Sequence, residues 1–243
     1  MVIKKLLDII IPVFNEGDNI KNTIASLIKN VNLEYNIFVC YDNDLDTTLQ
    51  TIKKYFSEQK NIFLIKNEGL GVHSAILTGI KKSISEYILI MPADDDYNYL
   101  IIDKMLAKAK KLSLDVVCPS RFAQGSKIVN GPFFKFLIVR IVNYSLYYLA
   151  RVPSKDSTNG FRLFSRRVVD NIKITSSNGF TYSIEYLLKA YEKKMLIQDY
   201  PADWYERKVG KSRFQIFGWC NDYLEWYFYA WKIQLKKIFK LNK

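Results

Sequence analysis

Apolar and polar positions alternate along the first 120 residues in blocks that predict strands separated by helices. Five blocks are almost continuously apolar and short enough to be buried strands, while the segments between them place apolar residues on one face of a helix. Strands that are apolar throughout are typical of parallel sheets with helices on both faces. The pattern therefore predicts an α/β fold with strands at residues 6–13, 36–41, 61–66, 87–92 and 114–120.

The second half of the chain has a different pattern. Residues 132–150 and 181–194 are apolar and aromatic and predict two helices. Between them, a polar turn at residues 156–165 leads into a short strand. A further strand signal is broken at Pro201, because proline cannot donate a ladder hydrogen bond.

The net charge says more about which partners the protein can bind than about its fold. The chain has 243 residues and a formal net charge of +12, which suits phosphate-bearing substrates, anionic lipid or nucleic acid. We expect no nucleic-acid partner, because the basic residues are spread out and acidic residues crowd the predicted cleft. One histidine and three distant cysteines predict neither a zinc site nor a disulfide framework.

Polar and acidic residues follow each of the five predicted strands. The strand ends read PVFNE, YDNDLD, KNEGLG, PADDD and PSRF, and the carboxyl ends of parallel strands form the edge where ligands bind. Neighbouring carboxylates there can hold Mg²⁺ or Mn²⁺, which neutralises a diphosphate leaving group. Each acid alone is more simply a turn residue or helix cap, so the convergence of five loops is what favours a site.

Eight stretches follow one another over residues 8–214: DIIIPVFNEGDNI, YDNDLDTT, GLGVHSAILTGI, MPADDDYN, SRF with the following PFFK, DSTNGFRLFSR, GFTYSIEYLLKAYEKK and ERKVGKSRF. Together they resemble the motifs of the family 2 glycosyltransferases, in the branch of the dolichol-phosphate mannosyltransferases and other polyprenyl-phosphate glycosyltransferases. The resemblance implies the GT-A fold and a divalent cation, Mg²⁺ or Mn²⁺. It also implies transfer of a sugar, with inversion, from a GDP- or UDP-sugar to a dolichyl or undecaprenyl phosphate.

The resemblance also implies roles for individual residues. The nucleoside pocket would be lined by residues of the first two strand ends: Pro12, Phe14, Glu16, Cys40 and Asp42. The acidic loop would supply the metal ligands Asp94 and Asp96, with Ala93 beside the diphosphate. Basic side chains suit phosphate contacts and would divide between acceptor and donor: Arg121 and Lys135 at the acceptor phosphate, Arg207 and Arg213 at the donor diphosphate.

The chain departs from the family pattern in its acidic loop. Pro92 stands where family members have their first metal-binding aspartate, and proline has no side-chain ligand. Asp96 stands where they have a glutamine, so the ligand charge is kept if one carboxylate has moved four positions along the chain. Further departures replace an aspartate, an arginine and a serine: Tyr41, Lys135 and Asn159.

Two other functions stay open. One is a family 2 transferase that adds a sugar to a glycan hydroxyl in surface polysaccharide synthesis, which needs a general base, and the candidates are Asp156 and Glu185. The other is a non-catalytic relative, which Pro92 suggests and the basic residues at 207 and 213 oppose. His73 lies in the glycine-rich turn and is expected to be structural.

The end of the chain is rich in aromatic and basic residues. We expect one domain over residues 1–213 and a tail of aromatic, amphipathic helices over residues 214–243. Aromatic residues next to lysines suit a membrane surface, although a helix packed on the domain fits equally well. With no spanning segment and no signal peptide in view, we expect a cytoplasmic protein attached peripherally to the inner face of the membrane. The oligomeric state is not predicted.

Overall fold

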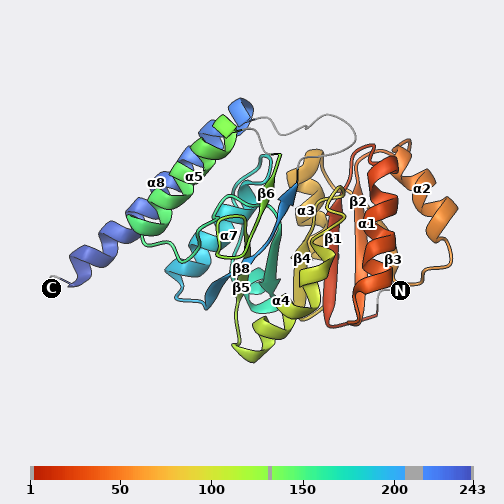
Figure 1. The fold of residues 1–243 in the computed structure, drawn as a ribbon, viewed down its shortest axis with the longest axis horizontal. Coiled ribbons are helices and arrows are strands. Elements are labelled where there is room, and N and C mark those ends of the chain that lie inside the picture. Colours follow the sequence, from red (N-terminus) through yellow and green to blue (C-terminus); the bar gives the residue numbers. More distant parts are fainter. Residues whose placement is uncertain (1–2, 131–132, 206–215, 242–243) are drawn as a thin grey trace.

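The computed structural model describes residues 3–130, 133–205 and 216–241, and its central feature is a mostly parallel sheet (Figure 1). In the described residues the sheet has seven strands in the order β3-β2-β1-β4-β7-β5-β8. β7 is antiparallel to both of its neighbours, and the other pairs are parallel. The strands are β1 (Leu7–Pro12), β2 (Tyr35–Tyr41), β3 (Ile62–Lys66), β4 (Tyr87–Ile90), β5 (Val116–Ser120), β7 (Arg162–Ser165) and β8 (Ile197–Pro201).

The strands are apolar throughout because both faces of the sheet are covered. Successive residues of a strand point to opposite faces, so Ile10 of β1 lies in one core while Ile9 and Ile11 lie in the other. All three are fully buried. Burial on both sides also fixes the register, since a slip of one residue would exchange the two faces.

Helices cover both faces of the sheet, as the sequence predicted. The core on one face includes side chains of α1 (Gly17–Asn30), α2 (Thr47–Phe56) and α4 (Tyr99–Lys111). The core on the other face includes side chains of α3 (Gly71–Lys82) and α7 (Thr181–Glu192). A short helix, α6 (Arg166–Asn171), follows β7.

Two long helices lie side by side at one end of the molecule (Figure 1). They are α5 (Phe133–Tyr148) and α8 (Ile216–Leu241). α8 also packs on α7 and buries Trp226, Ala230 and Ile233 in the same core. Over the residues described, no helix is both long and apolar enough to cross a membrane.

A second, two-stranded sheet lies beside the main one and pairs β6 (Ile128–Val129) with β9 (Trp204–Tyr205) in parallel. Trp204 donates its backbone N–H to the carbonyl of Lys127 at 2.8 Å. The Trp204 ring contacts the ring of Phe136 on α5, with the ring centroids 4.7 Å apart. The ribbon formed by β6 and β9 therefore connects the chain that follows β8 to α5.

Candidate functional site

The loop from β4 to α4 carries the three consecutive aspartates, and their side chains differ in exposure. Asp95 is only 5% exposed, whereas Asp94 and Asp96 are both half-buried. The carbonyl of Ala93 accepts a hydrogen bond from Thr23 Oγ1 at 2.7 Å, which fixes the loop to α1. Two carboxylates thus remain accessible to a ligand, with a buried one between them.

Asp95 organises the start of α4. Its Oδ1 accepts from the backbone N–H of Asn98 at 2.9 Å, and its Oδ2 accepts from Asn98 Nδ2 at 2.7 Å. Burial raises the pKa of Asp95 to about 6, although these hydrogen bonds oppose that rise. The Asp95 carboxyl is thus committed to its own loop.

The fit of a divalent cation can be judged from the donors present. No group of three or more His, Cys, Asp or Glu side chains that could hold a metal occurs in the described part of the chain. Mg²⁺ is commonly held by one or two carboxylates, with waters and substrate phosphates completing its shell. The half-buried Asp94 and Asp96 fit a cation of that kind, which substrate phosphates would complete, and Pro92 adds no ligand.

The loops after β1 and β2 are joined to each other. Both carboxylate oxygens of Asp46 lie 3.0 Å from the backbone nitrogen of Asn15, and Asp46 also caps α2 by accepting from the backbone N–H of Thr48. The N–H of Glu16 donates to Thr48 Oγ1 at 3.0 Å. Asn15 has a φ of 54°, a left-handed conformation that asparagine tolerates better than most residues. Side chains from the two strand ends are therefore held at one edge.

The residues expected to line the nucleoside pocket differ in their exposure and in their hydrogen bonds. Phe14 is 53% exposed and Glu16 is 9% exposed. Pro12 ends β1 and is half-buried. Asp42 accepts from the backbone N–H of Gly71 at 2.8 Å and from Asn67 Nδ2 at 2.6 Å, which joins the loops after β2 and β3.

Cys40 has a different environment from the other residues of that set. Its side chain is fully buried in the core below α3, where a Cβ on Gly79 would come within 2.8 Å of the sulfur. Burial raises the pKa of the thiol to about 12. Only the backbone carbonyl reaches toward the loop, and it accepts from the N–H of Val13 at 2.9 Å. The side chain of Cys40 thus belongs to the core.

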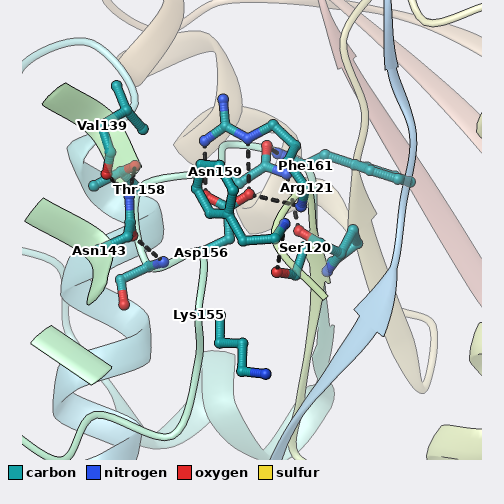
Figure 2. Close-up of polar contacts among 12 residues, drawn as sticks. Ser120, Arg121, Val139, Asn143, Lys155, Asp156, Thr158, Asn159 and Phe161 are labelled. Carbon is teal, nitrogen blue, oxygen red and sulfur yellow. Dashed lines mark hydrogen bonds and ion pairs between the residues drawn. The ribbon is translucent and has the colours of Figure 1, made fainter. Parts of the chain in front are cut away.

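Arg121, directly after β5, is held by a bidentate ion pair with Asp156 (Figure 2). Arg121 Nε and Nη2 each lie 2.7 Å from a carboxylate oxygen of Asp156, and the backbone N–H of Arg121 donates to the same carboxylate at 2.9 Å. Asp156 is fully buried, and the Arg121 side chain is 15% exposed. Burial tends to lower the pKa of Arg121, but the Asp156 carboxylate outweighs it, and the net shift is upward. The guanidinium is thereby held in place at the edge of the sheet, with its charge balanced by the Asp156 carboxylate.

The loop of residues 156–160 is shaped by an arginine that the sequence did not single out. Arg162 is fully buried and donates to the carbonyls of Asp156, Ser157 and Asn159, and to Ser183 Oγ. Asn159 in turn donates to the carbonyl of Pro119 at 2.9 Å. The only signal in the sequence was the position of Arg162 inside the stretch DSTNGFR.

The carboxylates considered as general bases are both engaged. Asp156 holds Arg121. Glu185 is fully buried on α7 and accepts from the backbone N–H groups of Thr175 and Ser176, at 2.7 and 2.8 Å. It also pairs with Lys189. Glu185 therefore anchors the loop that carries Thr175 and Ser176.

His73 is structural, as its surroundings show. It is 4% exposed on α3, its Nε2 lies 3.0 Å from Ser176 Oγ, and its ring packs edge-on against Tyr182. Burial lowers the pKa of the imidazole below its usual value. The remaining basic positions of the candidate site cannot be placed: Arg207 and Arg213 lie outside the described residues, and so does the side chain of Lys135.

Comparison with known proteins identifies relatives over most of the chain. The sequence pattern of Glycosyl transferase family 2 matches residues 8–173. A dolichol-phosphate mannosyltransferase of Pyrococcus furiosus is 26% identical over 211 residues, covering 85% of this chain and 58% of the relative. A dolichyl-phosphate beta-glucosyltransferase of Trichomonas vaginalis is 24% identical over 228 residues, covering 87% and 69%. The chain thus spans 58% and 69% of the length of these two curated relatives.

Solved structures establish the fold. Glucosyl-3-phosphoglycerate synthase from Mycobacterium tuberculosis, solved with Mn²⁺, UDP-glucose and phosphoglyceric acid, superposes with a TM-score of 0.64 at 12% identity and covers 86% of this chain and 72% of that one. TarS from S. aureus superposes with a TM-score of 0.59 at 20% identity, over 84% and 60%. The predicted GT-A fold and the predicted membership of family 2 are confirmed.

Proposed function

Because the chain belongs to Glycosyl transferase family 2, we propose that it transfers a sugar from a nucleotide sugar to a polyprenyl phosphate. The observation that carries this proposal is the gathering of three kinds of group at one edge of the sheet. These are the half-buried carboxylates Asp94 and Asp96, the linked loops around Asp42, and the fixed guanidinium of Arg121. The names of the two curated relatives supply the acceptor class.

In the proposed reaction each group has a separate task. Phe14, Glu16 and Asp42 bind the nucleoside, and Asp94 and Asp96 hold Mg²⁺ or Mn²⁺, which when bound neutralises charge on the departing nucleoside diphosphate. Arg121 orients the acceptor phosphate together with Lys135, which follows it in the same family motif. Arg207 and Arg213 grip the donor diphosphate. The acceptor phosphate attacks the anomeric carbon in line, which inverts its configuration.

The engaged carboxylates favour a phosphate acceptor over a hydroxyl acceptor. A hydroxyl needs a general base within hydrogen-bond reach, whereas a phosphate is already anionic at neutral pH. Asp156 is bound to Arg121 and Glu185 to the loop at Thr175, so both candidate bases are occupied. Transfer to a glycan hydroxyl is therefore the second candidate, and it would need a base other than these two.

Nucleotide-sugar binding is the direct test of the proposed function. A donor present at about 100 times its dissociation constant stabilises the folded state by about 2.7 kcal/mol, which raises the Tm of a chain of this size by about 5 °C or more. We expect such a rise with GDP- or UDP-sugars in the presence of Mn²⁺, measured by thermal unfolding against the same nucleotides without metal. Equal melting temperatures with GDP-, UDP- and dTDP-sugars and with buffer would instead support a non-catalytic relative.

We also propose that α5 and α8 attach the protein to the cytoplasmic surface of a membrane. Both helices expose large apolar side chains, which are Leu137, Ile138 and Ile141 on α5, and Leu224, Phe228, Leu235, Ile238 and Phe239 on α8. Amphipathic helices with such faces bind at the boundary of head groups and acyl chains. The net charge of +12 adds attraction to anionic lipid.

The attachment predicts a loss of vesicle binding when one apolar residue is replaced on each helix. Ile138 and Phe228 are 63% and 65% exposed, so Ile138→Ser with Phe228→Ser removes apolar surface without opening the core. We expect this double variant to float with anionic vesicles at least about tenfold less than the wild type, since burial of each side chain is worth about 1.5–3 kcal/mol. The control, Leu45→Ser with Leu100→Ser, changes residues just as exposed on other elements. An equal loss in the control would refute the assignment to α5 and α8.

A further inference from the structure

The end of the acidic loop is joined directly to β9. Asn98 Nδ2 donates both to Asp95 Oδ2 at 2.7 Å and to the carbonyl of Asp203 at 3.2 Å. The backbone N–H of Tyr205 donates to the Tyr97 hydroxyl at 3.4 Å, and the two tyrosine rings meet edge to face with centroids 4.6 Å apart. Two hydrogen bonds and a ring contact therefore connect the loop with a strand more than 100 residues away in sequence.

The connection is partly shielded from water, and Tyr97 and Tyr205 are half-buried. Asp95 and Asn98 are each 5% exposed. Hydrogen bonds of buried groups are costly to lose, because the partner left behind stays desolvated.

β9 is itself held from the opposite side. Asp203 Oδ1 accepts from the backbone N–H of Lys127 at 2.8 Å, and Trp204 N–H donates to the carbonyl of the same residue. The strand pairs with β6, and its Trp204 ring packs against Phe136 of α5. β9 is thus held by β6 and α5 as well as by the acidic loop.

We propose that Tyr97 and Asn98 are positioning residues that hold the acidic loop in register with β9. Tyr97 directly follows Asp96, and Tyr205 stands two positions before Arg207 in the chain. The link therefore sets Asp94 and Asp96 relative to the strand that leads into the basic segment. This inference rests on the proposed function, because it assigns the register to the transfer step.

Hydrogen exchange tests the link without needing activity. Tyr97→Phe removes only the hydroxyl that accepts from Tyr205 N–H. Tyr99→Phe, at the first residue of α4, makes the same chemical change two residues further along the chain. We expect backbone amides at residues 204–205 to exchange at least about fivefold faster in Tyr97→Phe and in Asn98→Ala, because local opening governs exchange. Rates equal to those of Tyr99→Phe would overturn the proposal, and Tyr97→Phe decides the matter even where Asn98→Ala folds poorly.

Steady-state kinetics separates a positioning role from a structural one. The donor concentration is varied while polyprenyl phosphate and Mn²⁺ are held saturating. We expect Tyr97→Phe to lower kcat by about tenfold, since small misplacements of reacting groups are costly. KM for the donor should stay within about twofold of the wild type, and Tm close to that of Tyr99→Phe. Faster exchange with unchanged kcat would overturn the positioning role. A wild-type protein without transferase activity would refute the proposed function, while the exchange rates would still decide the link.

Discussion

Asp94→Asn is expected to lower kcat/KM by at least about 100-fold and to weaken Mn²⁺ binding by a similar factor. The reason is that only two accessible carboxylates occupy the acidic loop, and a hard divalent cation loses a charged oxygen ligand when either is neutralised. Replacing residues that only hydrogen-bond to metal ligands already costs about 10–100-fold in metal affinity or activity. The measurement is an Mn²⁺ titration of nucleotide-sugar binding together with initial rates.

Asp96 provides the sharper half of this test. If its carboxylate replaces the one that Pro92 lacks, Asp96→Asn should match Asp94→Asn, and Pro92→Asp with Asp96→Gln should keep metal-dependent activity within about tenfold. Asp170→Asn is the matched control, because Asp170 is a largely exposed aspartate on α6, away from the loop. Full activity and metal affinity in Asp96→Asn would show that this carboxylate is not a ligand.

Asp156→Asn is expected to lower the free energy of unfolding by about 3 kcal/mol or more. The substitution leaves the Arg121 guanidinium with its charge inside the protein and without the fully buried carboxylate that now binds it through two atoms. Removing one partner of a buried ion pair is far more destabilising than removing one partner of an ion pair at the surface. Urea unfolding at neutral pH measures the difference.

Two further variants complete that experiment. One replaces both partners of the buried ion pair, and the other breaks an ion pair at the surface. Replacing both partners, with Arg121→Met and Asp156→Leu, removes the buried charge altogether and should be less destabilising than Asp156→Asn alone. It also removes the guanidinium that we propose orients the acceptor phosphate. Lys81→Met breaks an ion pair with Glu68 in which the two side chains are 67% and 43% exposed, and should cost less than about 1 kcal/mol. Equal losses for Lys81→Met and Asp156→Asn would contradict the role given to burial.

The parallel half of the fold could be predicted because its signals are local. β1, β2 and β3 are apolar runs that are separated by amphipathic helices, and their order along the chain fixes much of their pairing. β7 could not be placed in the same way. It has four residues, and its antiparallel position between β4 and β5 depends on contacts with strands far away in sequence.

The candidate site was predictable to the extent that it consists of loops at strand ends. Asp42, Asp94 and Arg121 all follow predicted strands, and the structure places them at the carboxyl edge. The surroundings of single side chains were not predictable. Cys40 alternates inward because of strand geometry, and Arg162 is buried because three loop carbonyls need donors, a requirement that exists only once the chain has folded.

The antiparallel strand β7 also sets the distance between β4 and β5. Neighbouring strands lie about 4.8 Å apart, so the insertion of β7 separates β4 from β5 by roughly 10 Å, twice the spacing of adjacent strands. Arg162 pairs with Ile90 at the last position of β4, which places the turn of residues 157–160 across this interval. In the proposed reaction the transferred sugar lies within this interval, between the carboxylates that follow β4 and Arg121, which follows β5. The width that β7 adds then leaves room for a sugar ring between the two phosphate sites.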